Sequence, residues 1–291
     1  MNTVRELAGR AVTVVEVGPR DGLQNETIAV STADKIAFVD RLSAAGLPVI
    51  EVSAFVSPKW VPQMADAADV FAGITRRPGV RYTALVPNMA GLERAIASEV
   101  SEIAIFASST ETFSRKNINQ TIDEAMRTYA DVSARALQAG LRVRAYLSTA
   151  FGCPYEGKVS EDTVTTMAKR LLALGVFEVA VSDTIGVATP GDVVRVLDAV
   201  LADIPSGRIA LHFHDTRRMA VANALTALPY GINTFDASAG GLGGCPYAPG
   251  AAGNLATEDL IYMLDGMGMV TGVSTAALKM ASAAILEKLR T

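Results

Sequence analysis

The most constraining feature of this chain is a strict alternation between short strand-like runs and helix-like segments. Eight runs are rich in β-branched or apolar residues, as expected of buried strands. They cover 11–17, 48–55, 81–86, 102–107, 142–149, 178–183, 209–215 and 234–239. Segments with apolar residues at three- and four-residue spacing separate them, the clearest being 35–45, 122–139, 164–174 and 193–201. This alternation predicts a parallel sheet, and eight such units close naturally into a (β/α)8 TIM barrel.

Capping residues support several of these helices. Thr32 is expected to open the first helix and Gly46 to end it, while Thr189-Pro190 is a typical start for a later one. A doubly wound open sheet is the alternative architecture. It is disfavoured because residues 16–20 lack a Gly-rich dinucleotide fingerprint and place proline where the helix would begin.

The length and charge of the chain limit the kinds of protein that it can be. Barrels of this size are common single units, so residues 1–291 are expected to form one catalytic domain. No apolar run in the sequence reaches the roughly 18 residues that a membrane span needs. The net charge is −4 and the basic residues are scattered, which argues against nucleic acid as a partner. Only about ten residues precede the first strand, fewer than the roughly 15 to 30 of a presequence, so we expect a cytoplasmic or an already mature protein.

The chain has only two histidines, and both stand in one short run, His212-Phe213-His214-Asp215. Alternate side chains on a strand point to the same face, so both imidazoles should emerge together. Two neighbouring imidazoles form half of a metal site, although two core histidines would give the same pattern. Residues elsewhere in the chain favour the metal site.

Barrel enzymes place their chemistry at the carboxyl ends of the strands, and polar residues of this chain gather there. Asp21 follows the first predicted strand and Asn254 follows the eighth. Both could add oxygen ligands to His212 and His214, although a loop cap and a turn residue are the simpler interpretations of each alone. Two nitrogens, one carboxylate and one amide oxygen suit Mg²⁺ or Mn²⁺, with zinc as a less typical alternative.

Three further charged residues lie near the same ends. Arg20 is suited to hold a carbonyl or enolate oxygen as negative charge develops, or it could form a surface salt bridge. Glu51 and Asp183 lie within predicted strands, where a buried carboxylate needs a partner or a function. We expect Glu51 to orient Arg20 or a group just behind the metal ligands, and Asp183 to hold a ligand histidine or a water, with structural ion pairs as the alternative.

Cys245 stands in a glycine-rich segment after the eighth strand. Such a loop can close over a ligand and bring a thiol to a reacting carbon. A free thiol has an ordinary pKa of about 8.5, which suits a general acid better than a nucleophile at neutral pH. A loop that cradles phosphate beside a bystander cysteine is the alternative. For Cys153 we favour a free thiol without a role.

Seven sequence segments, spread over almost the whole chain, form a distinctive set. They are VEVGPRDGLQNE at 15–26, FVSPKWVPQMAD at 55–66, RKNIN at 115–119, FGCPYEGKV at 151–159, SDTIGVATPGD at 182–192, HFHDT at 212–216 and GLGGCPYAPGAAGNLATEDLIYML at 241–264. Together they closely resemble the hydroxymethylglutaryl-CoA lyases, within a metal-dependent group of TIM-barrel lyases and synthases. The last segment is the most specific, because the related isopropylmalate and homocitrate synthases lack the GLGGCPYA loop.

The resemblance implies a retro-Claisen cleavage of 3-hydroxy-3-methylglutaryl-CoA to acetyl-CoA and acetoacetate, with Mg²⁺ or Mn²⁺ as cofactor. It implies metal ligation by Asp21, His212, His214 and Asn254, enolate stabilisation by Arg20, proton delivery by Cys245, and support from Glu51 and Asp183. Substrate contacts are expected from Arg20, Gln24, Ser53 and Tyr146. The group that removes the hydroxyl proton stays open among Asp21, His212 and a metal-bound water.

Two places depart from the family pattern. Arg217-Arg218 follow HFHDT where the family usually continues Tyr-Gly, and Thr27 stands where relatives often place lysine. The arginines would add positive charge near the mouth, for CoA phosphates or for another acyl carboxylate. A longer branched 3-hydroxyglutaryl-CoA or a citramalyl-like CoA ester is therefore an alternative substrate.

Two functions from other classes are also considered. One is a catalytically silent CoA- or metal-binding protein, and the other is a metal-dependent hydrolase of the same fold. An intact set of candidate ligands disfavours the first, and the second would leave Cys245 without a task. A homodimer or higher homo-oligomer is the default expectation for the assembly.

Overall fold

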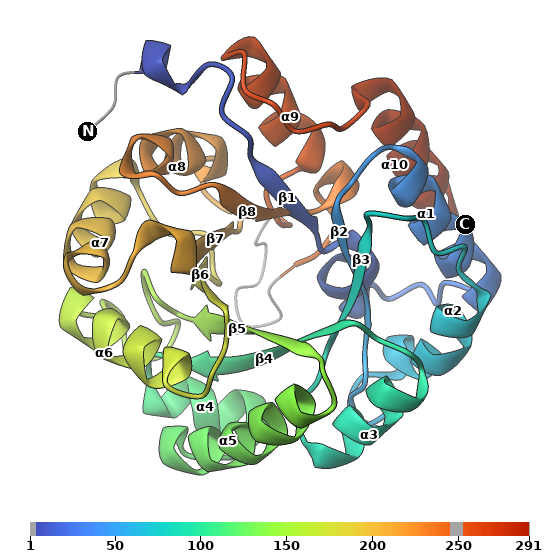
Figure 1. The fold of residues 1–291 in the computed structure, drawn as a ribbon, viewed down its shortest axis with the longest axis horizontal. Helices are drawn as coiled ribbons and strands as arrows, with labels where there is room; N and C mark the ends of the chain where they lie inside the picture. The colour runs from blue at the N-terminus through green and yellow to red at the C-terminus, as the bar shows by residue number, and fades with distance from the viewer. Residues whose placement is uncertain (1–3, 245–252, 291) are drawn as a thin grey trace.

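The computed structural model describes residues 4–244 and 253–290, and its strands close into a parallel eight-stranded barrel (Figure 1). Strands pair in sequence order, and the last pairs with the first. They are β1 (Thr13–Glu16), β2 (Val49–Ala54), β3 (Arg81–Leu85), β4 (Glu102–Ser108), β5 (Arg142–Ser148), β6 (Glu178–Asp183), β7 (Ile209–Phe213) and β8 (Thr234–Ala237). The predicted (β/α)8 barrel is confirmed, and the open doubly wound sheet is wrong because β8 hydrogen-bonds to β1.

Helices surround the barrel (Figure 1). They are α1 (Thr32–Ala44), α2 (Ala67–Gly73), α3 (Met89–Ala97), α4 (Glu111–Ile118), α5 (Ile122–Gln138), α6 (Glu161–Leu172), α7 (Pro190–Asp203), α8 (Ala220–Ala227), α9 (Thr257–Gly266) and α10 (Thr275–Lys288). A short π-helical turn, η2 (Gly18–Gly22), follows β1, and a 3₁₀ turn, η6 (Ala239–Gly241), follows β8. In the part of the chain that the structure describes, no helix is long and apolar enough to cross a membrane.

Local capping explains where the helices begin and end. Thr189 caps α7 as predicted, and it forms a reciprocal capping box with Asp192. The first helix is capped one residue earlier than expected, because the Ser31 side chain accepts a hydrogen bond from a backbone N–H in the first turn and Thr32 is already helical. Gly46, just past the end of α1, has the predicted left-handed backbone with φ +92°.

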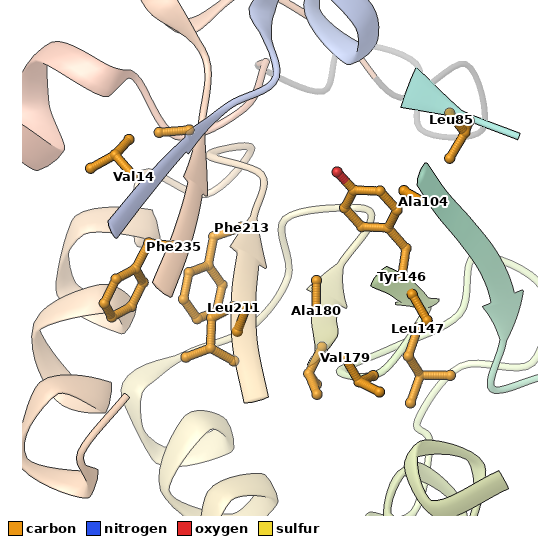
Figure 2. Packing of buried hydrophobic residues seen from close by; sticks show 14 of the residues in the cluster. Val14, Leu85, Ala104, Tyr146, Leu147, Val179, Ala180, Leu211, Phe213 and Phe235 are labelled. Carbon is orange, nitrogen blue, oxygen red and sulfur yellow. The ribbon is translucent and has the colours of Figure 1, made fainter. Parts of the chain in front are cut away.

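The main hydrophobic core combines strand and helix residues and so lies between the barrel and its helices. Figure 2 shows Leu211, Phe213 and Phe235 among the core side chains that the strands contribute. Because neighbouring residues on a strand face opposite sides, His212 and Asp236 point the other way, into the barrel. The fold thus directs polar side chains into the barrel and toward its carboxyl end, where η2 and η6 lie.

Candidate active site

Three of the four predicted metal ligands meet at the carboxyl end of the barrel. Asp21 lies in η2 after β1, His212 lies in β7, and His214 follows β7 directly. One candidate ligand atom from each residue lies within 4.8 Å of the others. The centroids of the two imidazole rings are 5.2 Å apart. The prediction that both histidines emerge on one face is confirmed.

The fourth predicted ligand, Asn254, packs against the same cluster. Its Nδ2 donates to Asp21 Oδ2 at 2.9 Å and to the carbonyl oxygen of Leu242 at 3.0 Å. Its Oδ1 is buried and has no hydrogen-bond partner among the described residues. A buried polar atom without a partner costs free energy, and a ligand bound to this oxygen would remove that cost. A cation beside Asp21 and His214 would satisfy it.

The protonation states around the cluster fit a divalent cation. Burial opposes ionisation of Asp21, but Arg20, the two histidines and the hydrogen bond from Asn254 together outweigh it and hold the pKa of the carboxyl well below its usual range. Burial, reinforced by His212, lowers the pKa of His214 to about 4, so this imidazole is neutral at neutral pH. Metal ligands must be deprotonated to bind, and this mixed oxygen and nitrogen set suits Mg²⁺ or Mn²⁺.

Arg20 is buried and held by two carboxylates. Its Nε donates to Glu51 Oε2 and its Nη1 donates to Asp21 Oδ1, so the two carboxylates hold the guanidinium from different directions. The phenol of Tyr146 donates to Glu51 Oε1 at 3.2 Å, and its ring centroid lies 5.3 Å from the guanidinium carbon. The second terminal nitrogen of Arg20, Nη2, donates to no described residue. This nitrogen is therefore available to a ligand.

Asp183 fixes a loop, and its carboxylate makes no hydrogen bond to either histidine in the part of the chain that the structure describes. Its carboxylate accepts hydrogen bonds from the backbone N–H groups of Val187 at 3.0 Å and Ala188 at 2.9 Å. The carboxylate that faces a ligand histidine belongs to Asp236 in β8, whose Oδ2 lies 3.2 Å from His212 Nδ1. The sequence analysis missed Asp236, although a charged residue inside a predicted strand is itself a signal.

A cavity of about 1040 Å³ opens above the cluster. Three of the four predicted substrate-binding residues, Arg20, Gln24 and Tyr146, line it together with both histidines. Its outer part is lined by Arg115 and Lys116 on α4 and by Trp60, whose side chain is 85 % exposed. The cavity therefore joins a polar inner end to a cationic and aromatic rim.

Ser53 was expected to bind substrate, but it does not line this cavity. It is buried, and its hydroxyl donates to Met64 Sδ at 3.3 Å. The pairing of β2 with β3 shifts register between Glu51 and Ser53, which breaks the alternation of side chains along β2. Strand alternation alone therefore does not describe where the side chain of Ser53 lies.

Cys245 lies outside the described residues. The residue before it, Gly244, lines the large cavity, and its carbonyl oxygen accepts a hydrogen bond from Asn25 Nδ2 at 2.9 Å. Cys153, the second cysteine, is buried, and its Sγ accepts a hydrogen bond from the hydroxyl of Thr110 at 3.2 Å. Cys153 therefore packs in the protein interior.

The positions that depart from the family pattern lie at the surface. Arg218 has a left-handed backbone with φ +56° and lines a smaller cavity of about 400 Å³, together with Asn254. Arg217 and Thr27 are exposed, and neither lines the large cavity. Positive charge is thus added next to the cluster by Arg218.

A closed (β/α)8 barrel with a candidate cation site and a fixed guanidinium at the carboxyl ends of its strands defines the class as a TIM-barrel protein with its candidate site at the end where such barrels place their chemistry. A family model narrows the class. The chain belongs to the HMGL-like family, whose model matches residues 11–285. The resemblance found in the sequence is thereby confirmed.

Individual relatives agree with the family assignment. The "3-hydroxy-3-methylglutaryl-CoA lyase, cytoplasmic" of Rattus norvegicus is 54% identical over 262 residues, covering 90% of this chain and 76% of the relative. The crystal structure of hydroxymethylglutaryl-CoA lyase from Pseudomonas aeruginosa superposes with a TM-score of 0.95 at 50% identity, covering 98% of this chain and 95% of the other. An HMG-CoA lyase from Acenitobacter baumannii, solved in complex with coenzyme A and 3-methylmalate, gives 0.92 at 37% identity, covering 100% and 93%.

Proposed function

We propose that this protein is a divalent-metal-dependent lyase that cleaves 3-hydroxy-3-methylglutaryl-CoA into acetyl-CoA and acetoacetate. The observation that carries the proposal is the meeting of Arg20 with Asp21, His212 and His214 on the wall of a large cavity, with Asn254 hydrogen-bonded to Asp21. Membership of the HMGL-like family and the names of relatives at about 50% identity support it.

In this proposal Asp21, His212, His214 and the free Oδ1 of Asn254 hold Mg²⁺ or Mn²⁺. When bound, the cation supplies a Lewis acid that polarises oxygen atoms of the substrate. Asn254 contributes in a second way, because its amide nitrogen donates to Asp21 Oδ2 and holds that carboxylate in place. The buried oxygen without a partner is the strongest sign that the site binds a cation.

Arg20 stabilises the charge that the reaction develops. As the carbon–carbon bond breaks, its electron pair moves toward the thioester, and the oxygen of the resulting enolate needs a fixed donor. The Nη2 of Arg20 is available for this oxygen, while Glu51 and Asp21 prevent the guanidinium from rotating. Glu51 is thus a positioning residue for Arg20, and Tyr146 holds the second oxygen of Glu51.

Two proton transfers complete the reaction. The 3-hydroxyl loses its proton as the carbonyl of acetoacetate forms, and the enolate carbon gains one to give acetyl-CoA. We assign the second transfer to the thiol of Cys245. Support for this assignment is that Gly244, the preceding residue, lines the cavity. Asp183 supports the site by fixing the loop after β6, next to the cavity-lining Thr184.

The CoA part of the substrate is placed along the cavity toward α4. Arg115 and Lys116 supply cations suited to phosphate groups, and Trp60 offers an exposed ring face suited to a purine. Gln24 lines the same cavity near its inner end and is assigned a substrate contact. Coenzyme A in the Acenitobacter baumannii relative supports an acyl-CoA substrate for this fold.

One observation favours a second substrate for the same reaction. Arg218 stands in a left-handed conformation that a non-glycine residue rarely adopts, in a cavity shared with Asn254. A cation held there suits an acyl group with a longer or additional carboxylate. A longer branched 3-hydroxyglutaryl-CoA or a citramalyl-like ester is therefore the alternative substrate.

The proposal extends to the whole protein. It describes one catalytic domain located in the cytoplasm, assembled as a homodimer or a higher homo-oligomer. Light scattering of the purified protein measures the assembly. A mass equal to one chain would contradict that part of the proposal and leave the chemistry untouched.

Turnover of 3-hydroxy-3-methylglutaryl-CoA tests the reaction. Metal-loaded protein should form acetyl-CoA and acetoacetate in equal amounts, and Cys245→Ala should lose this activity while still binding Mn²⁺. Free CoA released from simple thioesters without acetoacetate would identify a hydrolase instead. Cleavage of only the longer or citramalyl-like esters would select the alternative substrate.

A further inference from the structure

Four charged or titratable side chains form a ladder inside the barrel, which we call the interior ladder: Arg144 in β5, Glu178 in β6, His212 in β7 and Asp236 in β8. Arg144 Nε donates to Glu178 Oε1 at 2.8 Å. Its two terminal nitrogens donate to Asp236, at 2.7 Å to Oδ1 and at 3.2 Å to Oδ2. Asp236 Oδ2 also lies 3.2 Å from His212 Nδ1.

Burying the charged groups of the interior ladder costs free energy, so stabilisation of the barrel alone does not explain their presence. Its members are at most 7 % exposed, and buried ion pairs are often no more stabilising than apolar residues of the same volume. Asp236 does not belong to the cluster of candidate ligands formed by Asp21, His212 and His214. Its contact with His212 is the link between the ladder and that cluster.

The hydrogen bonds determine which nitrogen of His212 carries the proton. Asp236 accepts two hydrogen bonds from Arg144, so it is an acceptor toward His212 as well. In the neutral form of His212, Nδ1 must then be the donor, and Nε2 keeps its lone pair. His214 differs, because its Nδ1 is buried without a partner among the described residues. The two histidines are therefore positioned by different means.

We propose that Asp236, held by Arg144, is a positioning residue that fixes the Nδ1–H tautomer of His212 and so leaves Nε2 free to bind the metal. This inference rests on the proposed metal site and adds the part of the barrel interior that orients one of its ligands. Carboxylates that orient ligand histidines typically affect metal affinity about 10–100-fold.

The variant Asp236→Asn tests this geometry with little change of volume. An asparagine has one acceptor oxygen. This oxygen is expected to accept the shorter hydrogen bond from Arg144, which is 2.7 Å long in the unsubstituted protein. The amide nitrogen then faces His212 Nδ1 and donates to it, which forces the proton onto Nε2. The control is Glu178→Gln, which keeps an acceptor for Arg144 Nε and leaves Asp236 unchanged.

Nitrogen NMR reads the tautomers directly, because the chain contains only two histidines. In metal-free protein with ¹⁵N-labelled histidine, His212 should be the Nδ1–H tautomer, and His214→Gln assigns its signals. Asp236→Asn should convert it to the Nε2–H tautomer, and Glu178→Gln should not. An Nε2–H tautomer for His212 in the unsubstituted protein would overturn the inference, and that spectrum decides even if the variant fails to fold.

Titration with Mn²⁺ supplies the second readout. Asp236→Asn should weaken Mn²⁺ binding about 10–100-fold, while Glu178→Gln should stay within about twofold of the unsubstituted protein. Unchanged affinity in a folded Asp236→Asn protein would overturn the inference. No Mn²⁺ binding by the unsubstituted protein would instead refute the proposed metal site, whereas the tautomer assignment would still be decided by the spectra.

Discussion

At the scale of single residues, the proposed role of Arg20 requires the forked shape of its guanidinium as well as its charge. One guanidinium donates to Glu51 and to Asp21 in different directions and keeps a further nitrogen for the substrate. A lysine ammonium is a point charge and cannot reproduce this fork. Charge alone at this position is therefore insufficient for the proposed chemistry.

Arg20→Lys is expected to lower kcat by roughly 10²–10³-fold, the usual effect of removing one positioned oxyanion donor. The KM should change much less. Steady-state kinetics measure both. The matched control is Arg10→Lys at the amino end of the barrel, where Arg10 donates to Asn233. Equal losses in the two variants would mean that Arg20 has no special role.

Asp183 gives a prediction about pH. Burial raises its pKa from 3.8 to about 6, so between these values the folded state binds the proton more tightly than the unfolded state. The stabilisation by Asp183 is therefore largest below pH 4 and is lost as the pH rises through 6. Relative to Asp183→Asn, the advantage of the unsubstituted protein should shrink by about 2 kcal/mol between pH 4 and pH 8.

Urea unfolding of both proteins at the two pH values measures this difference. The comparison cancels the titration of all other groups that the substitution leaves alone. A stability difference that stays constant with pH would show that Asp183 titrates normally in the folded protein.

The residues of the site could be predicted only in part. His212, His214, Asp21 and Asn254 were found because their type and their position after a strand are both visible in the sequence. Asp236 and Arg144 were not found, because a charge inside a strand shows that a partner exists without showing which residue it is.

At the scale of elements, periodicity predicted the four clearest helices to within three residues at each end. It could not place Ser53, because the register shift in β2 depends on pairing with β3 and has no signal in the run itself. It also could not choose between Ser31 and Thr32 as the cap of α1, since both residue types suit that position.

Gly46 lies where two helices from opposite ends of the chain approach each other closely. It follows α1, and a Cβ added there would lie 2.4 Å from the carbonyl oxygen of Gly272, just before α10. Gly79 has a similar left-handed backbone, with φ +83°, but a Cβ there would meet nothing within 4 Å. Substitutions at the two glycines therefore distinguish the cost of backbone strain, present at both, from the cost of a steric clash, present only at Gly46.

Gly79→Ala should lower the free energy of unfolding by about 1 kcal/mol, from the left-handed backbone alone. Gly46→Ala should cost roughly 1–3 kcal/mol more, because the backbone of residue 272 must also shift. Chemical denaturation of both variants measures the difference. Equal stabilities would contradict the close approach of α1 and α10.

At the scale of the whole molecule, closure of the barrel creates the site. Pairing of β8 with β1 brings Asn254 beside Asp21, although 233 positions separate them in the chain. The closed barrel could be predicted from eight alternating units, and its closure predicted that the two residues would meet. The interior ladder crosses the same barrel from β5 to β8 and depends on the same closure.

The proposed function requires a metal at this end of the barrel for the lyase reaction. The most direct test follows cleavage of 3-hydroxy-3-methylglutaryl-CoA before chelation, after chelation, and after Mn²⁺ is returned. Formation of acetyl-CoA and acetoacetate should stop when elemental analysis shows that the metal is gone, and it should recover with about one Mn²⁺ per chain. Unchanged turnover by protein shown to be free of metal would refute the proposed metal dependence.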